Sequence, residues 1–315
     1  MTSQARIVTV TLNPAIDRTL SVPDFQVGEL NRVLEVRENA GGKGVNVASA
    51  LADLGVPVVA TGFLGRENAR LFEVLFRTKG IEDRFLRMDG STRLGLKLVD
   101  NSCQKVTELN CPGLTPGAAD LDALFATVRE LASPDTWFVL SGSLPPGAPA
   151  GLYADLIRVI HAQGAKVALD TSGEPLRLAL PAAPDIVKPN RKELEQLTGT
   201  AMTGLEDVAK AASHLLSQGI ALVAISMGVE GALFAQGDGM IVTTPPTVSL
   251  ESTVGAGDAM VAGLLFAQIQ GRNLSGSARF ATACGAHAVT RLASGVDLDA
   301  LPALELGVKL AAFHD

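Results

Sequence analysis

The chain contains few of the residues that build disulfide frameworks or zinc sites. Its 315 residues include three cysteines and four histidines. No two cysteines form a Cys-x-x-Cys pair, so Cys103, Cys111 and Cys284 predict reduced thiols in a cytoplasmic protein. The histidines lack the spacing of zinc ligands, which argues against a histidine-based zinc site. They are His161, His214, His287 and His314.

Long apolar runs and an excess of positive charge are also missing. No apolar stretch approaches the roughly 20 residues of a membrane-spanning helix. The start, MTSQARIVTVTLNP, has no long apolar core behind a basic head, so we expect no signal peptide. The net charge of −7 and a pI near 5.2 argue against a duplex-binding surface. We therefore expect a protein that binds neither membranes nor nucleic acids.

The dominant pattern is an alternation of short apolar strands with helical segments from about Val56 onward. The predicted strands lie in VPVVATGFLG, TWFVLSGSL, AKVALDTS, PDIVKPN and IALVAISMG. Residues 45–54 and 206–218 repeat apolar side chains at helical spacing. This alternation is typical of an α/β fold, in which a mostly parallel central sheet carries helices on both faces. Ligands of such sheets bind at the carboxyl ends of the strands.

Two stretches break this alternation and predict a small second sheet. AIDRTLSV with NRVLEVRE, and TRLGLKLVD with KVTELN, alternate with a period of two and have no helix between their members. Arg93, Gly95 and Lys97 fall on one face of the second hairpin, opposite three leucines. We therefore expect a β-sheet lid of residues 13–40 and 87–112. The α/β domain would comprise residues 1–12, 41–86 and 113–315.

The segment STVGAGDAMVAGLL, residues 252–265, predicts an anion site. Gly255, Ala256 and Gly257 precede an apolar pattern with helical spacing, so we expect a helix to begin at or near Gly257. Backbone N–H groups at a helix start bind anions, and glycines let a ligand approach closely. Asp258 is either a simple first-turn acid or a base that faces a hydroxyl attacking a bound phosphoryl group. The preceding glycines favour the base.

Two further motifs carry competing interpretations. Asn190 and Glu193 in VKPNRKELE fit a helix capping box, and the same carboxylate and amide suit Mg²⁺ or its waters. AGGKGVNVA, residues 40–48, is a glycine-rich turn into a helix, without the spacing of a Walker A loop. There Lys43 and Asn46 suit an anionic, hydroxylated ligand, although a plain helix start remains an alternative.

Taken together, these motifs resemble the ribokinase-like sugar kinases of the PfkB family. The shared segments follow the family's order along nearly the whole chain: TLNPAID, AGGKGVNVA, SGSLPPG, VKPNRKELE, SMGVEGAL and STVGAGDAMVAG. Among its phosphosugar kinases, the 1-phosphofructokinases are most similar. The resemblance implies a ribokinase-like fold and transfer of the γ-phosphoryl group of ATP, with Mg²⁺. The implied acceptor is fructose 1-phosphate, giving fructose 1,6-bisphosphate, with tagatose 6-phosphate and fructose 6-phosphate as alternatives.

The resemblance also implies residue roles. Asp258 would be the catalytic base, and Gly255, Ala256 and Gly257 would form the anion hole. Asn190 and Glu193 would lie near Mg²⁺ and would hold it through water, because Mg²⁺ keeps part of its hydration shell. The residues implied to bind nucleotide are Lys188, Asn190, Ser226, Gly228, Gly231 and Gly257. Those implied to bind the phosphosugar are Asp17, Gly42, Lys43, Asn46, Arg93, Ser143 and Asp258.

One position departs from the family's pattern. Related kinases carry Thr-Arg-x-Asn-x-Lys in the lid strand, and this chain has Gly95 in place of the asparagine. The departure bears on the identity of the sugar more than on the reaction.

Two other functions compete with a kinase. A nicotinamide-dependent oxidoreductase would need a third small residue where Val47 stands, and a non-catalytic sugar-phosphate sensor would have lost the base or the anion hole.

The lid strands also predict a homodimer. The apolar side chains of the two hairpins would leave an uncovered sheet face in water unless two lids packed together. The alternative is that each lid packs on its own body. The side chains concerned are Ile16, Leu20, Val22, Leu94, Leu96 and Leu98.

Overall fold

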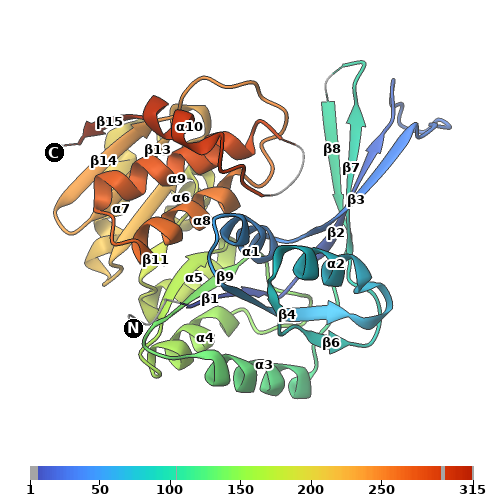
Figure 1. Ribbon diagram of the computed structural model, residues 1–315, viewed down its shortest axis with the longest axis horizontal. Helices are drawn as coiled ribbons and strands as arrows, with labels where there is room; N and C mark the ends of the chain where they lie inside the picture. The colour runs from blue at the N-terminus through green and yellow to red at the C-terminus, as the bar shows by residue number, and fades with distance from the viewer. Residues whose placement is uncertain (1–5, 104, 292–294, 314–315) are drawn as a thin grey trace.

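The structure, a computed structural model, describes residues 6–103, 105–291 and 295–313. It consists of a large sheet covered by helices on both faces, and a smaller sheet that projects from one side (Figure 1). No helix in the described ranges is both long and apolar enough to span a membrane.

The large sheet has the strand order β15-β14-β13-β12-β11-β10-β9-β1-β4-β5, and β6 also pairs with β4. The strands from β12 to β5 pair in parallel, whereas β13, β14 and β15 are antiparallel. This confirms the prediction of a mostly parallel sheet. The strands are β1 (Arg6–Thr11), β4 (Val58–Gly65), β5 (Glu82–Asp83), β6 (Leu86–Met88), β9 (Thr136–Ser141), β10 (Lys166–Asp170), β11 (Ile186–Val187), β12 (Leu222–Ser226), β13 (Ala232–Gln236), β14 (Gly239–Thr244) and β15 (Lys309–Ala312).

Helices cover both faces of this sheet and enclose two apolar cores. In β1, Ile7 faces one core while Val8 and Val10 face the other, as the period of a strand requires. On one face lie α1 (Lys43–Asp53), α2 (Arg70–Lys79), α8 (Ala256–Ile269), α9 (Leu274–Ala288) and α10 (Leu301–Gly307). On the other lie α3 (Ala118–Leu131), α4 (Leu152–His161), α5 (Gly173–Ala179), α6 (Arg191–Thr198) and α7 (Leu205–Ser217). Short 3₁₀ turns occur at η1 (Arg66–Asn68), η2 (Leu180–Ala182) and η3 (Gly228–Glu230).

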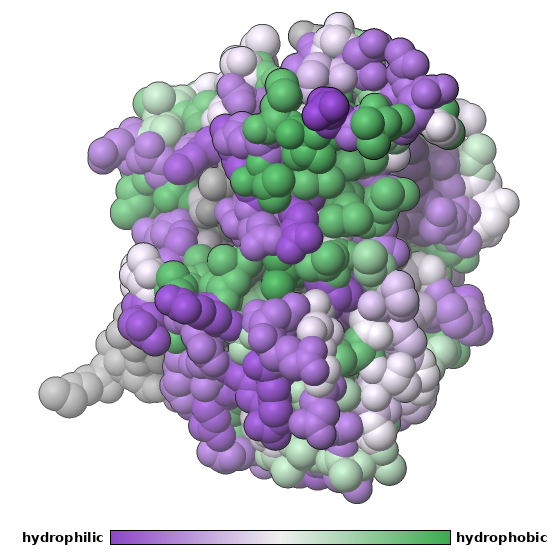
Figure 2. Space-filling model, turned by 90° about the vertical axis from the view of Figure 1, so that its right-hand side faces the viewer, coloured by the Kyte–Doolittle hydropathy of each residue, from purple (hydrophilic) through white to green (hydrophobic). Residues whose placement is uncertain are grey.

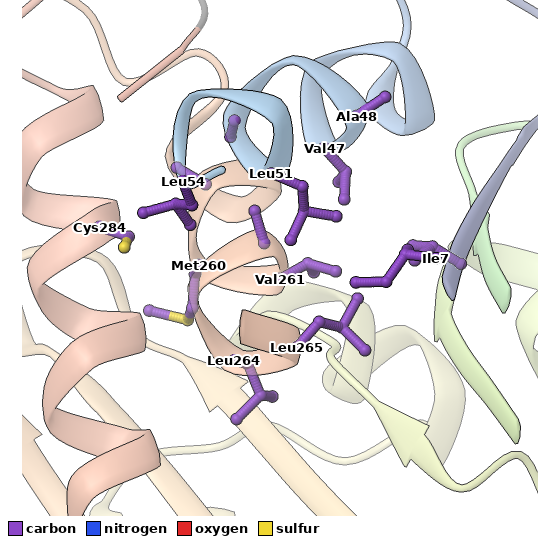
Figure 3. Close-up of a cluster of buried hydrophobic side chains, with 14 of the residues drawn as sticks. Ile7, Val47, Ala48, Leu51, Leu54, Met260, Val261, Leu264, Leu265 and Cys284 are labelled. Atoms are coloured by element: carbon purple, nitrogen blue, oxygen red, sulfur yellow. The ribbon is translucent and has the colours of Figure 1, made fainter. Parts of the chain in front are cut away.

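Helix α8 is buried on nearly all sides, because α1 and α9 pack against it. Leu51 of α1 and Leu265 of α8 point toward Ile7 of the sheet (Figure 3). A Cβ on Gly263 would lie 2.7 Å from Cys284 Sγ, so only glycine allows α9 to approach this closely. The packing of α1 against α8 brings the first turns of these two helices together, and the candidate site forms there.

The smaller sheet contains β2 (Ala15–Ser21), β3 (Glu35–Gly41), β7 (Leu94–Asp100) and β8 (Lys105–Asn110), in the order β3-β2-β7-β8. Both predicted hairpins are confirmed, because β2 pairs with β3 and β7 pairs with β8 in antiparallel fashion. The parallel pairing of β2 with β7 joins the hairpins into one sheet. We call this sheet the lid.

One face of the lid is mostly apolar, with the ion pair of Arg18 and Glu38 among its leucines, and is only partly covered by the body. Ile16, at the body end of β2, is 6% exposed, and Val22, just past the outer end of the same strand, is 2% exposed, so these two side chains need no second lid to cover them. Between them, Leu20 pairs with Val36 on one side and Leu98 on the other, and Val36 is 54% exposed. Figure 2 views this side of the molecule and shows a broad apolar area in its upper half, at the height of the lid.

Candidate active site

The carboxyl ends of four neighbouring parallel strands form one edge of the candidate site. Gly142 follows β9, Asp170 ends β10, Lys188 follows β11 and Ser226 ends β12. The first turns of α1 and α8 face this edge, as shown by the contacts of Lys43 with Asp170 and of Gly257 with Lys188. The sheet therefore has its polar groups where parallel sheets bind ligands.

Asp258 lies in the first turn of α8 and is 6% exposed. Asn46 Nδ2 in the first turn of α1 donates to Asp258 Oδ2 at 2.8 Å. Burial, and then the negative charge of Asp170, raises the pKa of Asp258 to about 6. The Asn46 hydrogen bond and the charges of Lys43 and Lys188 oppose this rise. A carboxylate with this pKa is ionised at neutral pH and binds a proton more readily than an ordinary aspartate.

Asp170 is a buried carboxylate that the sequence analysis did not single out. Its side chain is 1% exposed, and Oδ1 lies 3.1 Å from Lys43 Nζ and 3.4 Å from Lys188 Nζ. Burial opposes the charge of Asp170, but the two lysines outweigh it and lower the pKa of Asp170. Likewise, burial opposes the charge of Lys43, but nearby acids led by Asp170 outweigh it and raise the pKa of Lys43. One signal was available in the sequence: AKVALD is an apolar strand that ends in an acid.

The turn that leads into α8 has the geometry of a helix N-terminus open to a ligand. Gly255 is the N-cap with a φ of 81°, a conformation that favours glycine, and α8 begins at Ala256, one residue before the expected start. A Cβ on Gly257 would lie 3.3 Å from Lys188 Nζ, so the lysine and this turn are neighbours. The N–H groups of the first turn have no acceptor within the helix, and an ammonium group beside them adds positive charge.

Asn190 and Glu193 form the capping box that their spacing predicts. Asn190 Oδ1 accepts from the Glu193 N–H at 2.9 Å, and Glu193 Oε2 accepts from the Asn190 N–H at 2.8 Å. Glu193 Oε1 takes part in neither of these two hydrogen bonds. Asn190 also forms a parallel bridge with Ser226, so the start of α6 adjoins the end of β12.

Residues 226–231 form the turn of the β12–β13 hairpin, through η3. Gly228 and Gly231 both have positive φ, of 64° and 101°. A Cβ on Gly231 would lie 1.8 Å from the Thr243 carbonyl oxygen, so the fold requires glycine here whether or not a ligand binds. The segment SMGVEGA is therefore a hairpin turn.

Asp17 lies on the polar face of the lid, against two glycines. A Cβ would lie 2.5 Å from its Oδ2 if built on Gly41, and 2.8 Å from its Oδ1 if built on Gly95. Lys97 Nζ is 3.6 Å from Asp17 Oδ2. The two glycines therefore leave room for this carboxylate to lie flat on the sheet.

The loops that follow β3 and β9 meet beside Lys43. Gly42, the N-cap of α1, has a φ of 111°, and a Cβ there would lie 3.0 Å from both Thr11 and Pro14. Gly142 has a φ of 95°, and a Cβ on it would lie 3.8 Å from the Cβ of Lys43. Its carbonyl oxygen accepts hydrogen bonds from the hydroxyls of Tyr153 and Thr171 at 3.0 and 2.8 Å.

A cavity of about 450 Å³ opens between the lid and these loops. Arg93 supplies its positive charge, and Ser143 reaches it from the loop after Gly142. Asn13 and Asn110, which the sequence analysis did not single out, supply the amides, and Asn13 Nδ2 donates to Ser143 Oγ at 3.1 Å. Its lining comprises Asn13, Arg93, Asn110, Cys111, Pro112, Gly113, Ser143, Leu144, Pro145 and Pro146.

The structure therefore brings the predicted residues together in three groups. Lys43 and Lys188 contact Asp170, and Asp258, which accepts from Asn46, lies close enough to Asp170 to feel its charge. Asn190, Glu193 and the hairpin turn adjoin one another along the sheet edge. Asp17, Arg93 and Ser143 lie at the lid and its cavity, and the register pairs Asp17 with Gly95, two residues after Arg93.

Comparison with known proteins agrees with this arrangement. The family model described as pfkB family carbohydrate kinase matches residues 7–301. The chain is 50% identical to a 1-phosphofructokinase of Rhodobacter capsulatus, over 88% of both chains. It is 47% identical to a 1-phosphofructokinase of Xanthomonas campestris, over 91% of both. Phosphofructokinase-2 of Escherichia coli, solved in complex with fructose-6-phosphate, superposes with a TM-score of 0.89 at 30% identity, covering 96% of this chain and 98% of that one. The chain belongs to the pfkB family of carbohydrate kinases, and its fold is ribokinase-like.

Proposed function

We propose that this kinase transfers the γ-phosphoryl group of ATP to the 6-hydroxyl of fructose 1-phosphate, giving fructose 1,6-bisphosphate and ADP. The observation that carries the reaction is the pairing of a buried carboxylate, Asp258, with the open first turn of α8. A base and an anion site in one helix turn are what attack by a hydroxyl on a phosphoryl group requires. The 1-phosphofructokinases among its relatives support the choice of substrate.

Asp258 acts as the base in this proposal. Asn46 orients its carboxylate through the 2.8 Å hydrogen bond, and the pKa near 6 keeps it ionised at neutral pH. The proton of the attacking hydroxyl moves to Asp258 as the new P–O bond forms. Because Asp170 and Asp258 are both anionic, Lys43 and Lys188 balance the charge between them.

The transferred phosphoryl group would bind at Gly255, Ala256 and Gly257. The free N–H groups of this turn stabilise the charge on its equatorial oxygens, and the Lys188 ammonium adds to their field. The nucleotide would extend along the sheet edge toward Asn190, Ser226, Gly228 and Gly231. The bridge between Asn190 and Ser226 supports one continuous nucleotide surface there.

Mg²⁺ fits the oxygen ligands near the start of α6. Glu193 Oε1 remains outside the capping bonds, and Asn190 contributes an amide oxygen. No cluster of three or more acidic, histidine or cysteine side chains suited to a metal occurs among the described residues. This suits Mg²⁺, which keeps several waters and binds through one or two protein groups plus substrate phosphates. When bound, the ion would neutralise phosphate charge, with Glu193 and Asn190 holding it through water.

The phosphosugar would bind between the lid and the body. Arg93 and Ser143 would hold its phosphate in the cavity, while Asp17, Gly42, Lys43 and Asn46 would contact its hydroxyls. We propose residues 13–40 and 87–112 as a lid that closes over the sugar and residues 1–12, 41–86 and 113–315 as the kinase body. Closure would exclude water and limit hydrolysis of ATP.

We also propose that two lids pack together in a homodimer and that the enzyme works in the cytoplasm, where ATP is available. The partly uncovered apolar side chains Leu20, Val36, Leu96, Leu98 and Leu109 support the dimer. Because Ile16 and Val22 are buried within the chain at the two ends of β2, the interface would use the side chains between them and their neighbours on the adjoining strands.

The test is the release of ADP by the wild-type chain with ATP, Mg²⁺ and one phosphosugar at a time. We expect the largest kcat/KM with fructose 1-phosphate. A tenfold preference for fructose 6-phosphate or tagatose 6-phosphate, about 1.4 kcal/mol in transition-state binding, would overturn the proposed substrate. It would leave the proposed kinase activity unchanged. Binding of a sugar phosphate without ADP release would favour the sensor, although the base and the anion turn are both present.

A further inference from the structure

The lid carries a row of three paired residues on its polar face, beside the cavity. Asp17 of β2 pairs with Gly95 of β7, and Gly95 pairs with Asn110 of β8. A Cβ on Gly95 would lie 2.8 Å from Asp17 Oδ1 and 3.6 Å from Asn110 Oδ1. The two polar side chains therefore flank the glycine from opposite sides, and Asn110 presents an amide near the place where a side chain at position 95 would lie.

Asn110 also binds Arg93, the arginine that supplies the positive charge of the cavity. Arg93 Nη1 donates to Asn110 Oδ1 at 3.2 Å, while Arg93 Nε and Nη2 both donate to the Asn13 carbonyl oxygen at 3.4 Å. These bonds use three of the five N–H donors of the guanidinium, and they leave one on each terminal nitrogen. Two terminal N–H groups on a fixed plane suit a bidentate contact with a phosphate.

The sugar phosphates that compete for this site differ next to the phosphate. A ketohexose 6-phosphate can close only as a furanose, because its O6 is blocked, and its C5 then carries no hydroxyl. In the furanose form of fructose 1-phosphate, the carbon adjacent to the phosphate-bearing carbon is C2, which carries the anomeric hydroxyl. A polar group beside the residues that bind the phosphate would therefore meet a hydroxyl in fructose 1-phosphate but not in a ketohexose 6-phosphate.

We propose that Asn110 is a specificity-determining residue that forms a hydrogen bond with this anomeric hydroxyl and also positions Arg93. This inference rests on the proposed function. The Asn110 oxygen has a second lone pair for the hydroxyl, and its NH₂ group provides a donor. Gly95 places no side chain between Asn110 and Asp17, and an oxygen at its Cβ position would lie at hydrogen-bond distance, 2.8 Å, from Asp17 Oδ1 and 3.6 Å from Asn110 Oδ1. A site that bonds a substrate hydroxyl discriminates against analogues that lack it, because its polar group is then left unpaired.

The test is a chemical double-mutant cycle. The two proteins are the wild type and Asn110→Ala, and the two substrates are fructose 1-phosphate and 2,5-anhydromannitol 1-phosphate, which lacks only the anomeric hydroxyl. We expect Asn110→Ala to lower kcat/KM for fructose 1-phosphate about tenfold more than for the anhydro compound, the factor that one hydrogen bond provides. The ratio of kcat/KM for fructose 1-phosphate to that for fructose 6-phosphate should fall by a similar factor.

The matched control is Asn101→Ala, at the other end of the same hairpin, where Asn101 Nδ2 donates to Ser21 Oγ at 3.3 Å. We expect it to leave all the ratios unchanged. Protection of Cys111, which lines the cavity, from alkylation in a Cys103→Ser background gives a binding readout without turnover. In it, Asn110→Ala should weaken protection by fructose 1-phosphate more than protection by the anhydro compound.

The outcomes separate this inference from the proposed function. A wild type that prefers a 6-phosphate would overturn the proposed substrate, and this inference with it. A wild type that prefers fructose 1-phosphate, together with equal losses on both substrates in Asn110→Ala, would overturn this inference alone, since Asn110 would then act only through Arg93.

Discussion

Asn46 donates to Asp258 across 2.8 Å, and this single bond joins the first turns of α1 and α8, which come from opposite ends of the chain. One helix brings the glycine-rich turn with Lys43, and the other brings the GAGD turn. The bond depends on the apolar contact of these helices around Leu51, Val261 and Leu265 (Figure 3). Loss of that packing would separate the base from the sugar site.

Asp258→Asn should abolish turnover, with a loss of roughly 10²–10⁴-fold in kcat if proton abstraction is its main role. The amide can still accept from Asn46, so the loss would report on the proton rather than on the fold. Nucleotide binding, measured by calorimetry, should be retained because the turn of N–H groups is unchanged. Near-normal activity would rule out Asp258 as the base.

The same substitution should stabilise the fold at high pH. The pKa of Asp258 is about 6 in the folded protein and near 3.8 when unfolded, so the folded state binds the proton more tightly. Ionised Asp258 therefore destabilises the fold above pH 6, by about 3 kcal/mol at most, and this cost shrinks as the pH falls below 6. Melting curves should show a higher Tm for Asp258→Asn than for the wild type at pH 8, and a smaller difference at pH 5. A constant difference would contradict the raised pKa.

The pH profile of kcat/KM should have an acid limb near pH 6, since the base must be ionised. Asp170→Asn removes a negative charge that raises the pKa of Asp258, so it should move this limb to lower pH. Asn46→Ala removes a hydrogen bond that lowers the same pKa, so it should move the limb to higher pH. Opposite shifts in these two variants are the expected result, and shifts in the same direction would count against this account.

Gly231→Ala should destabilise the protein far more than Gly237→Ala. Both glycines have positive φ, 101° and 55°, but a Cβ on Gly231 would lie 1.8 Å from the Thr243 carbonyl oxygen, while Gly237 has nothing within 4 Å. We expect about 1 kcal/mol for Gly237→Ala, from its backbone conformation, and several times more for Gly231→Ala. Chemical denaturation measures both. Equal losses would mean that the hairpin shifts to admit the methyl group.

Leu98→Glu should convert the proposed dimer into a monomer, because it buries a charge between two lids. Light scattering at micromolar concentration measures the state, and Val74→Glu, at an exposed position of α2, is the control. A wild-type chain that is monomeric at this concentration would exclude lid packing.

The sequence was most informative where one short segment decides the structure. The helices at residues 45–54 and 206–218 were predicted to within two residues, and the capping box of Asn190 at the residues that form it. The apolar strands and both hairpins were located, but their ends were less accurate: the segment NRVLEVRE covers residues 31–38, whereas β3 is Glu35–Gly41. Local patterns determine these elements, either by periodicity or by a cap of fixed spacing. The motifs around Asp258 and Lys43 were likewise recognisable from small residues at a helix start.

What could not be predicted depends on distant parts of the chain. Asp170 reads as the last residue of an apolar strand, and only its contacts with Lys43 and Lys188 reveal its place between two cations. Asn110 reads as the end of an exposed strand, and its partner Arg93 comes from the start of the preceding strand. The raised pKa of Asp258 is similarly a property of burial and of neighbouring charges.

The parallel pairing of β2 with β7 also has a consequence for how the chain folds during synthesis. The β2–β3 hairpin emerges from the ribosome well before β7, and an isolated two-stranded hairpin is marginally stable in water. Its inner strand, β2, therefore waits with one edge unpaired until β4, α2 and β6 have been made. Pairings between distant segments form slowly, because loop closure precedes any gain from contacts. The lid is thus completed after the β1–β4 part of the body, and until then its unpaired edge is a site for association with other nascent chains.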